Sequence, residues 1–221
     1  KACQVTLLEW MTMHAPDEQV VVHDPVASGG RGGFHIKPGG KRMKWMIASD
    51  IHGSAYYCRK LLEAYEKEDI QIKSNENYRE VTMTPEGYAP KEVIELLNAR
   101  KNDIYCVRGN CDTEVDQMVL EFPVLADYCV IAEGETAVYA THGHIYNEQK
   151  LPPLHPGDIL LHGHTHVPKC TVHEEESYIY MNPGSVSLPK EDSWHGYMIW
   201  EDSEFVWKDF DGQEHMRKKL S

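Results

Sequence analysis

Four apolar, strand-like runs in this chain of 221 residues each end in a short cluster of Asp, Asn or His. KWMIAS leads into DIHG, DIYCV into RGNCD, TAVYA into THGH, and DILL into HGHTH. An α/β fold presents its ligand-binding groups beyond the ends of its strands. One such cluster is a weak signal, but four of similar composition predict a shared site at one edge of the fold.

The order of these runs indicates the fold class. From Lys44, a strand is followed by a helix that Ser54 can cap and that extends to about Lys67, and APKEVIELLNARK then precedes the strand DIYCVRG. The C-terminal half contains short strand-like runs separated by hairpin-length turns. We therefore predict an α/β domain whose second sheet is built from hairpins, with helices outside.

The first part of the chain differs from the rest. The glycine-rich stretch SGGRGGFHIKPGG lies just before KWMIAS, so residues 1–42 are predicted to be an N-terminal extension, a tail or linker, and residues 43–221 a single domain. A phosphate-binding glycine loop is the alternative for this stretch. It is the weaker one, because no GxxxxGK[ST] motif is present.

Composition limits the partners and the compartment. No apolar run approaches the length of a membrane span or signal peptide, and the six cysteines form no CxxC pair, which predicts a cytoplasmic protein with reduced thiols and no membrane contact. The formal net charge of −13 argues against an extended nucleic-acid surface. An anionic substrate would therefore need local positive charge, which bound cations could supply.

The clustered side chains offer carboxylate oxygen, amide oxygen and imidazole nitrogen. This donor set suits Mn, Fe or Zn, and it lacks the thiolates typical of structural zinc. In HGHTH the histidines alternate, so an extended backbone would direct them to one face. The sequence thus favours a catalytic metal site over a structural one.

The motifs DIHG, GNCD, THGH, GHTHVP and NPGSVSLPK occur in this order. Over about Lys44 to Trp207 the chain thereby resembles the calcineurin-like metallophosphoesterase superfamily, most closely its YfcE-like bacterial phosphodiesterases. EGYAPKEVIELLN and GNCDTEVDQM make the resemblance specific. It implies a four-layer αββα sandwich of two mainly mixed β-sheets flanked by helices, with a centre of two divalent ions, Mn²⁺ first and Zn²⁺ or Fe²⁺ as alternatives. The ligands that the resemblance implies are, for the first ion, Asp50, His52 and His166 and, for the second, Asn110, His142 and His164.

Two further residues follow Asn110 in the same motif. Many members of the superfamily have a histidine near the leaving-group oxygen where this chain has Cys111, so Cys111 and Asp112 are the expected catalytic residues. For Cys111 three roles stay open: a donor to the leaving group, a weak ligand, or a small buried thiol. Asp112 is expected to orient its neighbours. His144 and His162 are predicted to be structural neighbours of the site.

One departure from the family pattern affects the centre. The family has an apolar strand followed by a Gly-Asp pair, whose aspartate bridges the two ions, where this chain has KEDIQIKSNENYREVTMT. Two divalent ions about 4 Å apart repel by roughly 4 kcal/mol even in water. A hydroxide, or a substitute such as Asp69, Glu76 or Glu80, would have to offset this repulsion. Loss of the strand also predicts unpaired backbone groups on its neighbours.

These observations predict hydrolysis of a small phosphodiester substrate, with phosphomonoesters also considered, by a metal-activated hydroxide. The alternative is a catalytically impaired family member that serves as a protein-binding scaffold, which the missing Gly-Asp pair favours and the six retained ligands oppose. A weakly active single-metal hydrolase is a third possibility. Whether the protein forms a homo-oligomer is left open.

Overall fold

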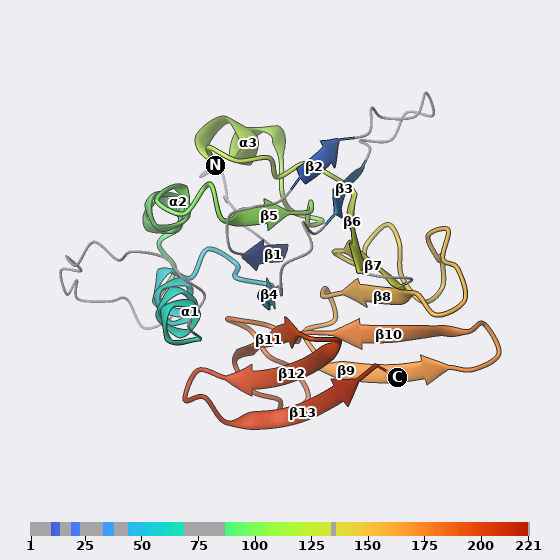
Figure 1. Ribbon diagram of the computed structural model, residues 1–221. Coiled ribbons are helices and arrows are strands. Elements are labelled where there is room, and N and C mark those ends of the chain that lie inside the picture. The colour runs from blue at the N-terminus through green and yellow to red at the C-terminus, as the bar shows by residue number, and fades with distance from the viewer. Residues whose placement is uncertain are drawn as a thin grey trace.

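The computed structural model describes residues 10–13, 19–22, 33–37, 44–68, 87–133 and 136–220 (Figure 1). The helices are α1 (Ala55–Lys67), α2 (Pro90–Asn98) and α3 (Glu114–Val119). The strands are β1 (Trp10–Met13), β2 (Gln19–Val22), β3 (Gly33–Lys37), β4 (Lys44–Ser49), β5 (Ile104–Cys106), β6 (Tyr128–Glu133), β7 (Thr136–Thr141), β8 (Ile159–His162), β9 (Lys169–His173), β10 (Tyr178–Asn182), β11 (Gly196–Glu201), β12 (Glu204–Asp209) and β13 (Glu214–Lys219).

The strands form two sheets. The six-stranded sheet has the order β13-β12-β11-β4-β1-β5, and the seven-stranded sheet has the order β2-β3-β6-β7-β8-β10-β9. All pairs in the first sheet are antiparallel, whereas the second is mixed, with parallel pairs β3–β6, β7–β8 and β8–β10. The predicted α/β sandwich of two sheets flanked by helices is therefore confirmed, but the six-stranded sheet is antiparallel where a mixed sheet was expected.

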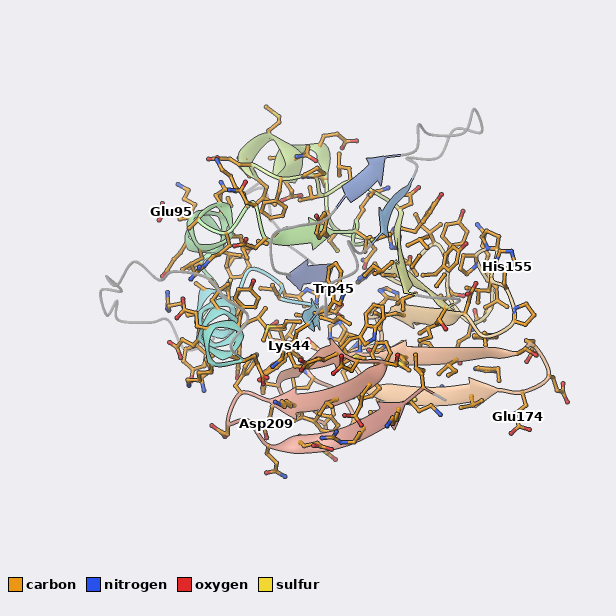
Figure 2. All side chains as sticks on the ribbon, in the orientation of Figure 1. Lys44, Trp45, Glu95, His155, Glu174 and Asp209 are labelled. Atoms are coloured by element: carbon orange, nitrogen blue, oxygen red, sulfur yellow. The ribbon has the colours of Figure 1, made fainter. Side chains whose placement is uncertain are left out.

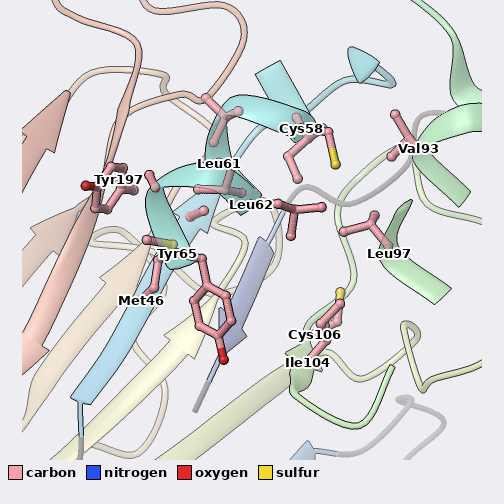
Figure 3. Close-up of a cluster of buried hydrophobic side chains, with 14 of the residues drawn as sticks. Met46, Cys58, Leu61, Leu62, Tyr65, Val93, Leu97, Ile104, Cys106 and Tyr197 are labelled. Carbon is pink, nitrogen blue, oxygen red and sulfur yellow. The ribbon is translucent and has the colours of Figure 1, made fainter. Parts of the chain in front are cut away.

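Three apolar clusters define the layers of this sandwich. The largest lies between α1, α2 and the outer face of the six-stranded sheet, where Leu61, Val93 and Met46 are fully buried (Figure 3). A second cluster, which includes Trp45, Ile131 and Trp200, fills the space between the sheets. On the outer face of the seven-stranded sheet, a small third cluster packs against Leu154, which belongs to the loop between β7 and β8. Figure 2 shows Glu95 on α2 and His155 in that loop on opposite sides of the molecule.

Helix α1 fixes the first of the predicted site motifs in space. Ser54 caps it as predicted, since its hydroxyl accepts a hydrogen bond from the Tyr57 N–H at 3.3 Å. The buried side of the helix includes Cys58, Leu61 and Tyr65, which recur at the spacing of an amphipathic helix (Figure 3). Because this side packs on β4, the strand and helix hold the intervening residues 50–53 from both ends.

The carboxylate of Glu68, just after α1, attaches the end of the helix to the sheet. It lies 3.0 Å from Lys44 Nζ and 2.6 Å from Lys208 Nζ, and it accepts a hydrogen bond from the Tyr197 hydroxyl at 3.0 Å. Burial raises the pKa of Glu68, but the two lysines outweigh burial and hold the pKa below its ordinary value of 4.5. The ion pairs therefore stabilise the fold above that pH and lose their effect as the pH falls through the lowered value.

Glu68→Gln is expected to lower the free energy of unfolding at pH 7 by about 2 kcal/mol, because two partly buried ammonium groups lose their counter-charge. Urea denaturation at a series of pH values measures this effect. The difference between the two proteins should narrow below about pH 4.5, where the unfolded wild-type glutamate is protonated. A difference that stays constant down to pH 3 would contradict this role for the carboxylate.

Strand β1 lies between β4 and the edge strand β5 of the six-stranded sheet. It pairs antiparallel with β4, Trp10 opposite Ser49, and antiparallel with β5, Met11 opposite Cys106. Since β4 and β5 both run opposite to β1, they run in the same direction, as two strands that flank a shared parallel neighbour would. The expectation of unpaired backbone groups on these two strands is therefore wrong: a strand from the N-terminal part of the chain lies between them.

Residues 1–42 thus contribute to both sheets. Besides β1, the range contains β2 and β3, which extend the seven-stranded sheet beyond β6. The described parts of the range are strands, whereas the sequence predicts a tail or linker there. The division into an N-terminal extension, residues 1–42, and a single domain, residues 43–221, stays a proposal. The substitute carboxylates named above, at positions 69, 76 and 80, lie outside the described residues. No helix in the described ranges is long and apolar enough to span a membrane.

Candidate metal centre

The residues predicted as ligands follow β4, β5, β7 and β8, and their backbones have an unusual conformation. Asp50, His52, His164 and His166 all have positive φ, between 49° and 67°. The left-handed region costs a non-glycine residue roughly 1 kcal/mol or more, so it persists only where surrounding contacts impose it. Four such residues among six predicted ligands indicate that the local backbone is held for a purpose other than stability.

Asp50, His52 and His166 form the first cluster. The Asp50 side chain is fully buried, and its Oδ1 atom lies 3.2 Å from His166 Nε2 and 3.5 Å from His52 Nε2. The two Nε2 atoms are 3.2 Å apart. His52 and His166 keep 20% and 10% of their side-chain surface exposed, so the cluster is reached from solvent on the histidine side.

Hydrogen bonds prepare this cluster for a cation. His166 Nδ1 donates to the Leu188 carbonyl at 2.7 Å, which leaves its Nε2 directed at the carboxylate. Asp50 Oδ2 accepts from the Ser49 hydroxyl at 2.7 Å and from the His164 N–H at 3.1 Å. Asp50 Oδ1 is buried and, within the described ranges of the chain, accepts no hydrogen bond of normal geometry. The three side chains, in which a buried carboxylate oxygen faces two imidazole nitrogens, are therefore a candidate site for a metal ion.

The electrostatics of the cluster agree with this interpretation. Burial raises the pKa of Asp50, but the imidazoles of His166, His52 and His142 together outweigh burial and hold the pKa well below its ordinary value. For His166, burial lowers the pKa and the Asp50 carboxylate raises it, with a net rise. The carboxylate is thus ionised at neutral pH and favours positive charge beside it. A divalent ion would supply that charge in place of a proton.

Asn110, His142 and His164 form the second cluster. His142 Nε2 lies 2.8 Å from Asn110 Oδ1 and 3.0 Å from His164 Nδ1. The His164 N–H donates to Asp50, which joins the two clusters through a single residue. Ligand atoms around one ion at roughly 2.1 Å lie about 3 to 3.5 Å from one another, and the donor atoms of both clusters have close to this spacing. The residues present therefore fit two neighbouring ions.

Cys111 and Asp112, predicted as catalytic, are placed differently from each other. Cys111 is exposed beside Asn110, whose amide donates to its sulfur at 3.2 Å. Asp112 is buried, and its Oδ2 accepts from the Gly109 N–H at 2.7 Å. Asp112 therefore closes the turn that presents Asn110, whereas the thiol of Cys111 faces solvent at the second cluster.

The histidines predicted as structural neighbours also differ. His162 is buried, its Nδ1 donates to the Gly163 carbonyl at 3.0 Å, and its ring lies 4.5 Å from that of Tyr180. Burial lowers the pKa of His162, so it is neutral at pH 7. His144 packs with its ring 5.4 Å from that of His142.

Three supporting residues are missing from the predicted set. The hydroxyls of Ser185 and Ser187 both donate to the Asp50 carbonyl at 3.0 Å, and Asn182 donates to the Gly163 carbonyl at 3.0 Å. All three lie in NPGSVS, which is part of a motif that carries the family resemblance but for which the sequence assigned no residue roles. Their signal is a run of small hydrogen-bonding residues after an apolar strand. Together they hold the two loops in their left-handed conformations.

Gly163 allows these loops to approach each other. A Cβ at this position would collide with Ser49 Oγ and lie only 2.7 Å from Asp50 Oδ2. The absence of a side chain between His162 and His164 therefore lets the His164 N–H reach the Asp50 carboxylate. This contact explains why glycine separates these two histidines.

Comparison with known proteins agrees with the fold and with the order of the motifs. The Phosphodiesterase YfcE of Escherichia coli strain K12 is 42% identical over 153 residues, which cover 67% of this chain and 82% of that protein, and the same figures hold for the YfcE of strain O157:H7. A solved structure described as YfcE, a phosphoesterase from E. coli, superposes with a TM-score of 0.70 at 34% identity, over 80% of this chain and 98% of the other. The profile of the calcineurin-like phosphoesterase superfamily domain matches residues 43–204. The chain therefore belongs to the calcineurin-like phosphoesterase superfamily.

Proposed function

We propose that this protein is a metal-dependent phosphodiesterase that cleaves small phosphodiesters at a centre of two divalent ions. The observation that carries the proposal is the joined pair of clusters: two imidazoles lie at ligand spacing from the buried Asp50 carboxylate, and an amide oxygen and a second imidazole lie at ligand spacing from His142. Asp50, His52 and His166 would hold one ion and Asn110, His142 and His164 the other. Manganese suits this oxygen and nitrogen donor set, and zinc and iron are the alternatives.

When bound, the ions would lower the pKa of a water molecule and stabilise charge on the phosphoryl oxygens. The chain itself contributes position and protons. Hydrogen bonds to Leu188 and Asp50 fix the rings of His166 and the backbone of His164 before substrate arrives. The exposed thiol of Cys111, beside Asn110, is the proposed donor to the departing ester oxygen.

The centre has to tolerate the loss of the bridging aspartate. Among the described residues, the group of three or more acidic, histidine or cysteine side chains close enough to share an ion is Asp50, His52 and His166. The second cluster holds an amide and two imidazoles, which are neutral ligands. We therefore propose that the second ion binds more weakly than the first and that an anion from solvent offsets the repulsion between them.

Metal content and turnover, measured together, test this function. The protein is loaded with manganese, desalted and assayed by elemental analysis and with bis(p-nitrophenyl) phosphate. We expect more than one manganese per chain and hydrolysis that excess chelator abolishes. One ion with weak turnover would support a single-metal hydrolase. No ion and no turnover would refute the enzyme and favour a protein-binding scaffold, for which the missing Gly-Asp pair is the supporting observation.

A further inference from the structure

Two residues with exposed side chains, Tyr88 and Leu188, lie on segments that are hydrogen-bonded to the first cluster or to the residues that follow His52. Tyr88 is 44% exposed and Leu188 is 54% exposed. Isolated surface apolar residues are common and carry no meaning by themselves. These two are different because the residues on either side of Tyr88 are hydrogen-bonded to the segment that follows His52, and the Leu188 carbonyl accepts a hydrogen bond from the His166 ring. The Nε2 atoms of His52 and His166 lie 3.2 Å apart.

Tyr88 is fixed beside the segment that follows His52. It forms an isolated antiparallel bridge with Ser54. On either side of this bridge, Ala55 N–H donates to the Gly87 carbonyl at 2.8 Å and Ala89 N–H donates to the Gly53 carbonyl at 2.9 Å. The backbone of Tyr88 is thus held opposite Ser54, which is two residues beyond the predicted ligand His52.

Leu188 is fixed to the other side of the same cluster. Its carbonyl accepts the hydrogen bond from His166 Nδ1 at 2.7 Å, and its N–H donates to the Ser185 hydroxyl at 2.9 Å. That hydroxyl in turn donates to the Asp50 carbonyl at 3.0 Å. The backbone of Leu188 is therefore fixed beside the first cluster, while more than half of its side chain is exposed to solvent.

We infer that Tyr88 and Leu188 are specificity-determining residues that contact the ester group retained on phosphorus, and that the favoured substrates are phosphodiesters whose retained group is aromatic or otherwise flat and apolar. The inference rests on the proposed function. Cys111, the proposed donor to the departing oxygen, lies at the second cluster, so the departing group would be on that side and the retained group on the side of His52 and His166. Ligand sites pair a few polar groups with apolar walls in this way.

Two diesters with the same departing group test the inference. Bis(p-nitrophenyl) phosphate and methyl p-nitrophenyl phosphate both release p-nitrophenolate but retain an aryl or a methyl group. In Tyr88→Ala and in Leu188→Ser, the ratio of kcat/KM for the aryl over the methyl diester should fall about 10-fold. Tyr88→Phe and Leu188→Met, which keep apolar area, should retain the wild-type ratio. Val172→Ser is the matched control, because Val172 is 49% exposed on β9, away from the cluster.

Calorimetric titration of the manganese-loaded proteins with diphenyl phosphate and dimethyl phosphate gives a readout that does not depend on turnover. Loss of affinity for the diphenyl ester alone, in the Ala and Ser variants, would support direct contact. Variants that hydrolyse both diesters at the wild-type ratio would overturn the inference and leave the phosphodiesterase proposal intact. A wild-type protein that hydrolyses neither diester would overturn the phosphodiesterase proposal, and the inference with it.

Discussion

Asp50→Asn is expected to remove the first ion and, with it, hydrolysis of bis(p-nitrophenyl) phosphate. Changing a residue that only supports a metal ligand typically costs about 10- to 100-fold in affinity or activity, and losing the charged ligand itself should cost more than that. The amide oxygen can still accept the hydrogen bonds from Ser49 and His164 that the carboxylate accepts. The variant should therefore fold, while the negative charge that attracts a cation is gone.

The measurement pairs manganese content with kcat/KM, and circular dichroism verifies folding. Asp158→Asn is the matched control, because Asp158 is also buried and its two oxygens accept the N–H groups of Ala137 at 3.0 Å and His155 at 2.7 Å. Asp158 lies just before the start of β8, whereas the histidines of HGHTH lie at the end of that strand and beyond it. We expect this control to lose stability but to keep its metal. If Asp50→Asn retained wild-type metal content and rate, the centre would not be where the geometry places it.

Thr12→Pro is expected to lower the free energy of unfolding by about 3 kcal/mol. Thr12 lies in the middle of β1, opposite Ile47 on β4 and Tyr105 on β5. A strand with neighbours on both sides uses every backbone N–H, so proline removes one ladder bond and leaves a carbonyl on a neighbour without its donor.

Urea denaturation measures the change, and amide hydrogen exchange of β4 and β5 locates it. Thr12→Val is the control, because valine is β-branched, keeps its N–H and suits a strand. It should differ from the wild type by less than about 1 kcal/mol. Equal stability of the proline variant, with unchanged exchange on both neighbours, would mean that β1 does not hold these strands together.

The side chains that the sequence proposes as ligands lie together in two clusters, and their motifs could be found because each has a local composition of Asp, Asn and His. Each motif directly follows an apolar strand, so Asp50, His142 and His164 lie at the ends of β4, β7 and β8, and the packing of the two sheets brings these strand ends together. The spacing of two residues between His164 and His166 also suggested that both project alike. In the structure both have left-handed backbones and belong to different clusters, which alternation in an ideal strand does not describe.

The position of β1 could not be predicted from its sequence. WMTM is short and has no clear alternation, so no local preference distinguishes it from a loop. Its strand conformation follows from the backbone groups that β4 and β5 offer on either side. Tertiary context of this kind overrides local propensity. The supporting hydroxyls of Ser185 and Ser187 were missed for a related reason, since their partner, the Asp50 carbonyl, is distant in the chain.

The origin of β1 has a consequence for how the protein folds. In a β-α-β unit a single helix joins two neighbouring parallel strands, so the loop that must close when they pair is short. Here β1 pairs with β5 across roughly 90 residues, so loop-closure entropy opposes the contact until much of the chain is organised. The edge of the six-stranded sheet that β1 and β5 form would then assemble after the local hairpins of β11, β12 and β13. Asn110, which follows β5 and belongs to the second cluster, therefore depends on a pairing between segments that are far apart in the chain.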